Sequence, residues 1–504
     1  MNEKIIEKLS KELEQALKEY DGEEKVKLNI KPEELEQLIF TAGHRFLAFD
    51  FDLIKKLDLT GVSFANVKVS KLNFEGSYGV KLNPQTVLGR SLFKTTLKDV
   101  EIEGSFDRVS ILDANFTGSK GAVINPQTIY NRSLNGTILK DTTIEGSFNG
   151  VNIERTDFTG SKGAVINPRT IYNRSLNGTI LQDTKIIGSL DGVNIAETNF
   201  TGSKGAVINP QTIYKRNLYR TILQDTKIIG SLDGVYIRYT DFTGSKGAVI
   251  NPQTIRDKSL RYTNLKDTKI KGSFDGVSFE NTNFTGSKGA VINPQTVYTK
   301  DLSGTILKDA IIKGSLDGVR IAYTDFTGSK GAVINPQTIY GRDLYRTILK
   351  DAEIKGTLDG VFIESTNFTG SKGAVINPQT VYNKSLEYAI LKDAIIKGSL
   401  DGVRITYTDF TGSKGAFIDP QTVYGRNLYR TILKDTIITG PLYGVDIRYT
   451  DFTGSRGAVI ETDNRYLSSC EGLEDVIVYD DLEQCEMKQY VSIKHEIHRK
   501  ILKK

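Results

Sequence analysis

The side chains that most often perform catalysis are scarce in this sequence. Its 504 residues include three histidines and two cysteines, which are His44, His495, His498, Cys470 and Cys485. The H-E-I-H motif at 495–498 lacks the H-E-x-x-H spacing that places two zinc ligands and a base on one helical face. The separation of the two cysteines fits no zinc pattern either. We therefore expect no enzyme activity, no metal and no cofactor.

An aspartate recurs at a constant interval along the chain. The column comprises Asp99, Asp141, Asp183, Asp225, Asp267, Asp309, Asp351, Asp393 and Asp435. General acid–base catalysis by carboxyls needs two of them within several ångströms, and each copy supplies one. We interpret these aspartates as turn residues that accept backbone hydrogen bonds.

A cation recurs with the same period in a G-S-K-G turn. The column comprises Lys120, Lys162, Lys204, Lys246, Lys288, Lys330, Lys372, Lys414 and Arg456. Glycine-rich backbone beside a cation can hold phosphate, yet the Walker pattern G-x-x-x-x-G-K-[ST] does not occur. The preferred interpretation is a solvated corner that is repeated with the unit, and the alternative is a ridge that binds a polyanion.

Tyrosine and arginine occupy positions at which the copies differ from one another. These positions form the candidate interaction surface: Tyr219, Arg220, Tyr239, Tyr323, Tyr345, Arg346, Tyr407, Tyr429, Arg430 and Tyr449. Other copies carry Glu, Asn, Ser or Gly there. Tyr and Arg are enriched in the residues that dominate protein interfaces, whereas the simpler interpretation is stacking between neighbouring tyrosines.

All of these residues belong to one repeat, whose clearest marker is a phenylalanine before a glycine-rich turn. It occurs at Phe74, Phe116, Phe158, Phe200, Phe242, Phe284, Phe326, Phe368, Phe410 and Phe452, with no insertion or deletion between copies. A fixed period of this size is typical of a solenoid, in which each unit must stay in register with its neighbours. We expect these phenylalanines to be inward core plugs.

Within a repeat, large apolar residues are mostly five positions apart, as at Ile255, Leu260, Leu265 and Ile270. This period fits neither a helix nor a half-buried strand. It fits a chain that turns a corner every five residues, so that four faces make a coil of about 20 residues. The repeat length of forty-two then equals two coils and about two more residues, which we place in the G-S-K-G-A-V-I-N-P-Q-T stretch. In that stretch Asn251 can cap a short helical turn that begins at Pro252.

These residues resemble the pentapeptide-repeat proteins, whose A-(D/N)-(L/F)-x-x units wind into a right-handed quadrilateral β-helix. Ala114-Asn115-Phe116 matches that unit, and residues 240–242 and 263–265 match it with Thr for Ala. The resemblance covers roughly residues 53–460. It implies an all-β solenoid. The sequence departs from the family pattern where Thr, Val or Gly replaces Ala and where each second coil carries an N-P-Q-T insertion.

We expect three segments: a helical N-terminal cap over 1–48, the β-helix over 49–460, and a C-terminal cap over 461–504. The last has a β-like patch at Val476–Tyr479 and a helix near 481–502. Open ends of a stacked array need caps. The sequence leaves open a homodimer formed through them. No signal peptide or membrane span is evident, which predicts a cytoplasmic protein with free thiols.

The sequence favours a non-enzymatic scaffold, a rigid rod that mediates protein–protein interaction with a partner it does not identify. One alternative is binding of nucleic acid or another polyanion along the lysine column. The resemblance supplies another, because some pentapeptide-repeat proteins imitate DNA and bind gyrase. That mimicry requires an acidic rod, whereas the excess of acidic side chains lies at the two ends and the centre is basic.

Overall fold

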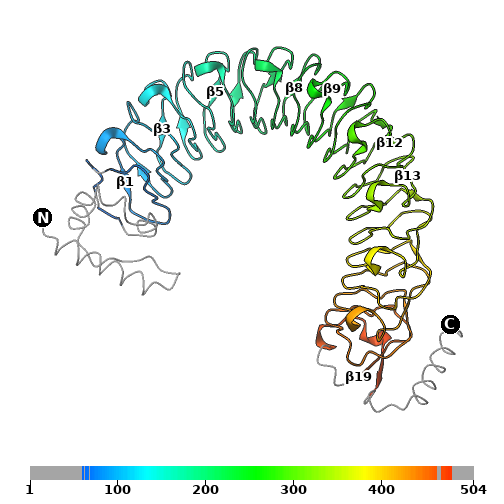
Figure 1. The fold of residues 1–504 in the computed structure, drawn as a ribbon. Helices are drawn as coiled ribbons and strands as arrows, with labels where there is room; N and C mark the ends of the chain where they lie inside the picture. Colours follow the sequence, from blue (N-terminus) through cyan, green and yellow to red (C-terminus); the bar gives the residue numbers. More distant parts are fainter. Residues whose placement is uncertain (1–58, 62, 67, 462–466, 480–504) are drawn as a thin grey trace. The chain divides into compact units, whose positions relative to one another are not determined.

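The computed structural model describes residues 59–61, 63–66, 68–461 and 467–479. It divides into two compact units, Met1–Ala248 and Val249–Lys504. Within each unit the chain winds into coils that stack on one another (Figure 1). The helical N-terminal cap expected over 1–48, the helix near 481–502, and residues His44, His495, His498 and Cys485 all lie outside the described residues.

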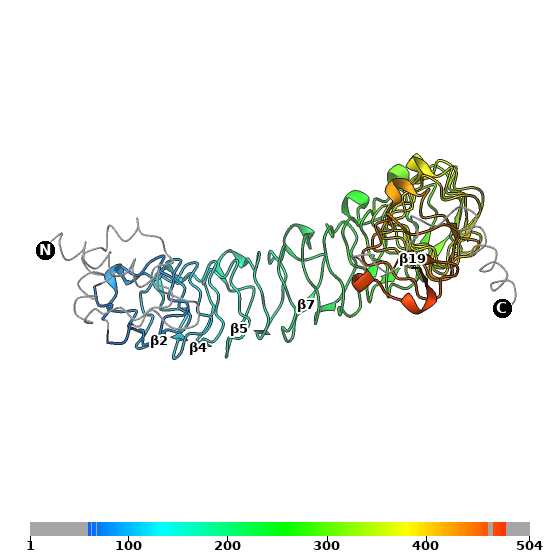
Figure 2. The same ribbon diagram turned by 90° about the horizontal axis from the view of Figure 1, so that it is seen from below.

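The coils of the first unit are held together by short parallel strands. The pairs are β1 (Lys81–Leu82) with β2 (Glu101–Ile102), β3 (Val123–Ile124) with β4 (Thr143–Ile144), β5 (Val165–Ile166) with β6 (Lys185–Ile186), and β7 (Val207–Ile208) with β8 (Lys227–Ile228). Single parallel bridges, such as Lys185 with Lys204, continue the stack between these pairs. Figure 2 shows these coils following one another along the first unit.

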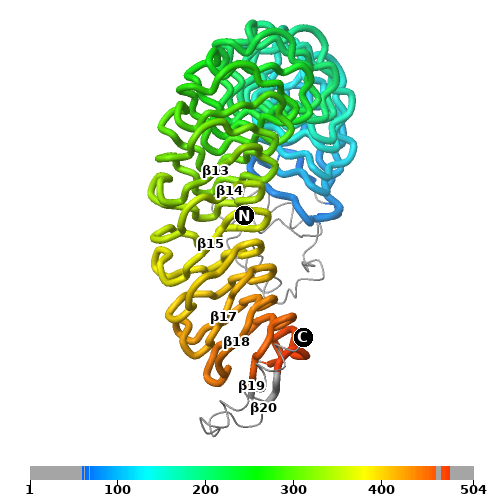
Figure 3. Tube along the Cα trace, turned by 90° about the vertical axis from the view of Figure 1, so that its right-hand side faces the viewer, coloured from blue at the N-terminus to red at the C-terminus, as the bar shows by residue number. Residues whose placement is uncertain are grey.

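The second unit repeats this arrangement. Its pairs are β9 (Val249–Ile250) with β10 (Lys269–Ile270), β11 (Val291–Ile292) with β12 (Ile311–Ile312), β13 (Val333–Ile334) with β14 (Glu353–Ile354), β15 (Val375–Ile376) with β16 (Ile395–Ile396), β17 (Phe417–Ile418) with β18 (Ile437–Ile438), and β19 (Val459–Glu461) with β20 (Ile477–Tyr479). Figure 3 shows the coils that carry β13 to β18 in succession. Strand β20 falls in the predicted patch Val476–Tyr479.

The register confirms two coils per repeat. Val165 pairs with Lys185, one coil later, and the next paired strand begins at Val207, after a second coil that is longer by two residues. Four buried side chains, Ile166, Ile171, Leu176 and Leu181, point into the first of these coils, one for each face. The fold is therefore the four-sided β-solenoid that the five-residue step predicts.

The extra residues of the longer coil lie in the first half of the expected stretch. In that coil the large buried side chains that fill the four faces are Ile186, Leu190, Ile195 and Phe200, and the next of this kind is Ile208, eight residues on. The step from Ile208 to Ile213 is again five, so N-P-Q-T is not itself an insertion. The added residues form the S-K-G-A bend. Gly205 adopts a φ of +82° there, and a Cβ on it would lie 2.8 Å from the Ile186 carbonyl oxygen.

The Asn-Pro turn forms as expected, and a short helix that the sequence analysis missed follows it. In one copy Asn209 Oδ1 accepts a hydrogen bond from the Gln211 amide at 3.2 Å. A single 3₁₀ turn then begins at Tyr214. The first unit contains η3 (Leu88–Arg90), η4 (Tyr130–Arg132), η5 (Tyr172–Arg174) and η6 (Tyr214–Arg216). The second contains η7 (Arg256–Lys258), η8 (Tyr298–Lys300), η9 (Tyr340–Arg342), η10 (Tyr382–Lys384), η11 (Tyr424–Arg426), η12 (Leu467–Ser469) and η13 (Leu473–Asp475).

The interior of each unit is a column of large apolar side chains. All ten repeat phenylalanines are fully buried, with an exposed fraction of 0%. Full burial of such a side chain contributes roughly 1.5–3 kcal/mol. Some buried positions carry Thr where the family pattern has Ala, and the hydroxyl is satisfied. Thr179 Oγ1 donates to the Ile153 carbonyl at 2.8 Å, and Thr198 Oγ1 donates to the Leu176 carbonyl at 2.7 Å.

Candidate interaction surfaces

The predicted Tyr/Arg positions lie on a corner of the coil, and a local turn sets their direction. Asn217 Oδ1 accepts a hydrogen bond from the Tyr219 amide at 2.9 Å. Arg220 follows in the left-handed region, with a φ of +54°. This turn leaves Tyr219 half-buried against the stack and Arg220 exposed. The second unit repeats the hydrogen bond at Tyr345 and Tyr429, with Asp343 and Asn427 as acceptors.

In the first unit the three predicted residues Tyr219, Arg220 and Tyr239 form one cluster. The rings of Tyr219 and Tyr239 meet edge to face, with centroids 5.5 Å apart. The Arg220 guanidinium lies 5.1 Å from the Tyr219 centroid and 5.5 Å from that of Tyr239. Tyr236, which the sequence analysis did not include, stacks on Tyr219 at 5.7 Å.

The second unit contains two such clusters. Tyr323, Tyr345 and Arg346 form the first, with ring centroids 5.3 Å apart and the guanidinium 5.2 Å from the Tyr345 centroid. Phe362, which was not predicted, stacks on Tyr345 at 5.2 Å. All three predicted residues therefore lie together, joined by one further ring.

The other cluster is larger and contains Tyr407, Tyr429, Arg430 and Tyr449. The Arg430 guanidinium lies within 5.6 Å of all three ring centroids. Tyr388, which was also missed, stacks on Tyr407 at 4.4 Å. Partial desolvation, together with Tyr429 alongside, raises the pKa of the Tyr407 hydroxyl above its ordinary value. The rings and the arginine thus hold one another in fixed positions.

The three cluster arginines share one electrostatic property. Arg220, Arg346 and Arg430 form no ion pair with a carboxylate of the described residues; the ion pairs found there involve other side chains. Each guanidinium therefore lies on aromatic rings while its N–H groups stay available to another molecule. The structure places all ten predicted surface residues in these three clusters.

A second tyrosine column lies on the 3₁₀ turns. Its members are Tyr130, Tyr172 and Tyr214 in the first unit and Tyr298, Tyr340, Tyr382 and Tyr424 in the second, and they are between 46% and 58% exposed. Each has a basic residue two positions later, such as Arg132 after Tyr130. The Tyr-x-basic pattern recurs with the period of the repeat and could have been found in the sequence.

The lysine column lies on the strand side of the coils, and every member is exposed. It does not stand alone there. In the first unit Lys204 forms a parallel bridge with Lys185, and Lys246 forms one with Lys227. Lysines from successive coils are therefore adjacent on this side, about 4.8 Å apart along the stack.

The aspartate column accepts backbone hydrogen bonds, which confirms the interpretation as turn residues. Asp183 Oδ2 accepts from the Gly160 amide at 2.8 Å, and Asp225 Oδ2 accepts from the Gly202 amide at the same distance. In the second unit Asp351 and Asp393 do the same for Gly328 and Gly370. Each carboxylate thereby connects one coil to the next.

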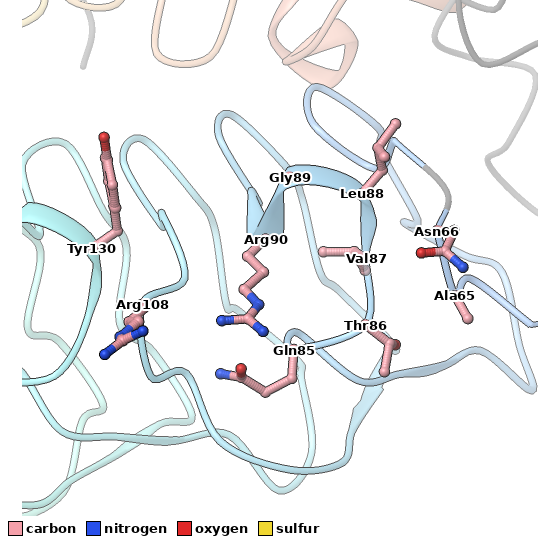
Figure 4. A pocket seen from close by; sticks show the side chains of 10 residues that line it. All are labelled: Ala65, Asn66, Gln85, Thr86, Val87, Leu88, Gly89, Arg90, Arg108 and Tyr130. Carbon is pink, nitrogen blue, oxygen red and sulfur yellow. The ribbon is translucent and has the colours of Figure 1, made fainter.

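The described residues contain no group of three His, Cys, Asp or Glu side chains that could hold a metal ion. A groove of about 730 Å³ on the first coils is lined by neutral and basic side chains, among them Gln85, Leu88, Arg90, Arg108 and Tyr130. Figure 4 shows that these side chains come from neighbouring coils. The groove lining includes no carboxylate or histidine that could act as a base. No helix in the described part of the chain could span a membrane.

Two solved structures of pentapeptide-repeat-type proteins are similar to this chain. One is a trypsin-treated form of QnrB1, a plasmid-mediated fluoroquinolone resistance protein, with 12% identity over 58% of this chain and 88% of that chain and a TM-score of 0.10. The other is HetL, a pentapeptide repeat protein involved in heterocyst differentiation regulation from the cyanobacterium Nostoc sp. strain PCC 7120. It has 14% identity over 68% of this chain and 90% of that chain and a TM-score of 0.11.

No protein-family description and no curated protein sequence matches the chain. TM-scores near 0.1 carry no weight in assigning the fold. The assignment as a β-solenoid therefore rests on the coil register and on the buried five-residue steps.

Proposed function

We propose that this four-sided β-solenoid is a non-enzymatic scaffold that binds another protein through its Tyr/Arg clusters. One observation carries the proposal: each cluster packs an arginine on two or three tyrosine rings, and no carboxylate of the described residues pairs with that arginine. Tyr and Arg are the residue types most often responsible for binding energy at protein interfaces.

The geometry also lowers the cost of association. An arginine that is free in solution loses side-chain entropy when a partner immobilises it, at about 0.5–1.5 kcal/mol. Arg430 is already positioned by Tyr407, Tyr429 and Tyr449. A partner that offers carboxylates can therefore pair with a preorganised donor.

Pull-down with the intact chain tests the proposal. The variant Tyr407→Ser, Arg430→Gly, Tyr449→Ser uses residues that other copies carry at these positions, namely Ser365 and Gly304. We expect partner binding to fall by at least about 30-fold, because hot-spot side chains contribute about 2 kcal/mol or more each. Tyr298→Arg is the control, since it alters the other tyrosine column and introduces the residue found at Arg256. A partner retained by the triple variant would contradict the proposal.

A second candidate function is binding of a polyanion along the lysine column. The bridges that place Lys185 beside Lys204 and Lys227 beside Lys246 favour it. Gel-shift titration with DNA or RNA should then show affinity that falls steeply with salt. Absence of binding at low salt would exclude it. The basic centre of the chain argues against DNA mimicry, and we expect no effect on gyrase in a supercoiling assay.

A further inference from the structure

The strand side of the coils carries a second kind of side chain beside its lysines. We call the side formed by the two-residue strands the β-face. In the first unit it presents exposed aliphatic residues, with Val165 at 39%, Ile187 at 42%, Val207 at 40% and Ile229 at 43% exposure. Among the described residues, Leu88 is the one aliphatic side chain of similar exposure that lies off this face. The exposed tyrosines of the first unit lie off this face, whereas in the second unit the aromatic Phe417, 52% exposed, lies on it in β17.

Lysines are numerous on this face. On the first coils Lys81 pairs with Glu101 and Glu103, whereas the lysines of the later coils of this unit are different. In the first unit Lys162, Lys185, Lys204, Lys227 and Lys246 lie on five successive coils, and none forms an ion pair with a described residue. The nearest carboxylates along the chain, Asp183 and Asp225, already accept hydrogen bonds from glycine amides. Like charges placed opposite each other on a sheet are destabilising.

In the second unit the same composition recurs with its positions exchanged. One strand of the first unit presents Lys185 and Ile187 on either side of a buried Ile186, whereas the corresponding strands of the second present Ile311 and Lys313, and Ile395 and Lys397. Lysine and isoleucine thus change places between these copies, whereas other copies carry different pairs there: Glu101 and Glu103, Thr143 and Glu145, Lys269 and Lys271, Glu353 and Lys355, and Ile437 and Thr439. Coil packing needs only the buried residue between them.

We propose that the β-face binds the surface of an anionic lipid bilayer. Lysine ammonium groups would pair with lipid phosphates and carboxylates, and the aliphatic side chains would enter the boundary between headgroups and acyl chains. Both rows lie on the same side of the stacked coils, so one bilayer surface could contact them together.

The side-chain types separate a bilayer from a nucleic acid. Proteins that hold single strands stack bases on aromatic rings or arginine. The outward strand residues between Lys162 and Lys246 include neither. Val, Ile and Lys offer no flat surface to a base, but they offer aliphatic area and charge to a lipid. The inference is independent of the Tyr/Arg clusters.

Vesicle co-sedimentation of the full chain tests this inference. We expect binding to mixed phosphatidylcholine–phosphatidylserine vesicles and none to phosphatidylcholine alone. The variant Lys185→Thr, Lys227→Thr carries the residue of Thr143 and should bind roughly 25-fold more weakly, at about fivefold per lysine. Ile187→Thr, Ile229→Thr, with the residue of Thr439, leaves the net charge unchanged and should weaken binding about tenfold.

The control removes the same charge elsewhere. Arg169→Gln, Lys215→Asn carries the residues of other copies, Gln127 and Asn173, at exposed positions off the β-face. This variant should bind within about twofold of the parent. No vesicle binding at low salt would overturn the inference, and so would equal loss in the control. Binding to DNA or RNA that is at least as tight as to vesicles and unaffected by the isoleucine variant would assign the face to nucleic acid instead.

Discussion

A column of buried serines allows a sharp test of the packing. Ser161, Ser203 and their equivalents from Ser119 to Ser455 are about 5% exposed, and their Oγ atoms have no hydrogen-bond partner among the described residues. A buried hydroxyl without a partner costs about 1–3 kcal/mol. On the same face of the alternate coils, the corresponding positions hold Ala310, Ala352 and Ala394, so a methyl group is accommodated there.

We therefore expect Ser203→Ala to stabilise the chain. Deleting the oxygen removes the desolvation cost. The void that it leaves, of about 15 Å³, reduces this gain by roughly 0.4 kcal/mol. The net gain is about 1 kcal/mol for each site. Ser161 and Ser203 are two coils apart, so the double Ala variant should gain about 2 kcal/mol. The neighbouring Thr184 is the contrasting control. Its Oγ1 donates to the Leu181 carbonyl at 2.6 Å, and Thr184→Val should cost about 1 kcal/mol.

Urea unfolding followed by far-ultraviolet circular dichroism measures both the stabilisation expected for the serine variants and the destabilisation expected for Thr184→Val. A double Ala variant that is less stable than the parent would refute the reasoning, because it would show that the serine hydroxyls make a stabilising hydrogen bond. Stabilisation by Thr184→Val would also refute the reasoning, because it would show that the Thr184 hydrogen bond does not stabilise the chain.

Three further predictions concern single groups. Asp183→Ala should cost about 1–2 kcal/mol in urea unfolding, because it removes the acceptor for Gly160 and leaves a residue with a Cβ at a φ of +65°. Asp183→Gly should cost less, and an equal cost would show that backbone strain at this position does not contribute. Hydrogen bonds from Ser399 and Thr422 lower the pKa of Asp401, so its contribution is present above the unfolded pKa of about 3.9 and is lost as pH falls through the lower folded value. Thr422→Val should flatten that acid loss, and an unchanged pH profile would count against it. Burial raises the pKa of Cys470, so in a Cys485→Ser background Ellman's reagent should react with it more slowly at neutral pH than with an unfolded control.

The five-residue step was sufficient to predict the coil, because each face needs one large inward side chain whatever its neighbours are. Differences between the copies identified the Tyr/Arg positions as variable and outward. It did not identify Tyr236, Phe362 or Tyr388, which join the clusters from other positions in the repeat. Contact between them depends on how far each coil is offset from the next.

The second lysine row illustrates the same limit. The separation of Lys185 and Lys204 along the sequence is a multiple of neither the five-residue step nor the repeat length. The step from the buried Ile186 to the buried Leu190 is four residues instead of five, and this shorter step brings Lys204 beside Lys185 on the next coil. The 3₁₀ turns were missed for a related reason: they are three residues long and contain a left-handed central residue such as Asn173, so no helical period exists to detect.

The sequence by itself determined the solenoid, its two coils per repeat, its phenylalanine core and its outward variable positions, since these follow from periodicity and from the need to bury apolar groups. The tertiary structure alone decided which outward residues are neighbours. Shorter and longer coils alternate, so surface contacts depend on offsets between coils. Those offsets place arginine on tyrosine at one corner and lysine beside lysine and isoleucine on the β-face.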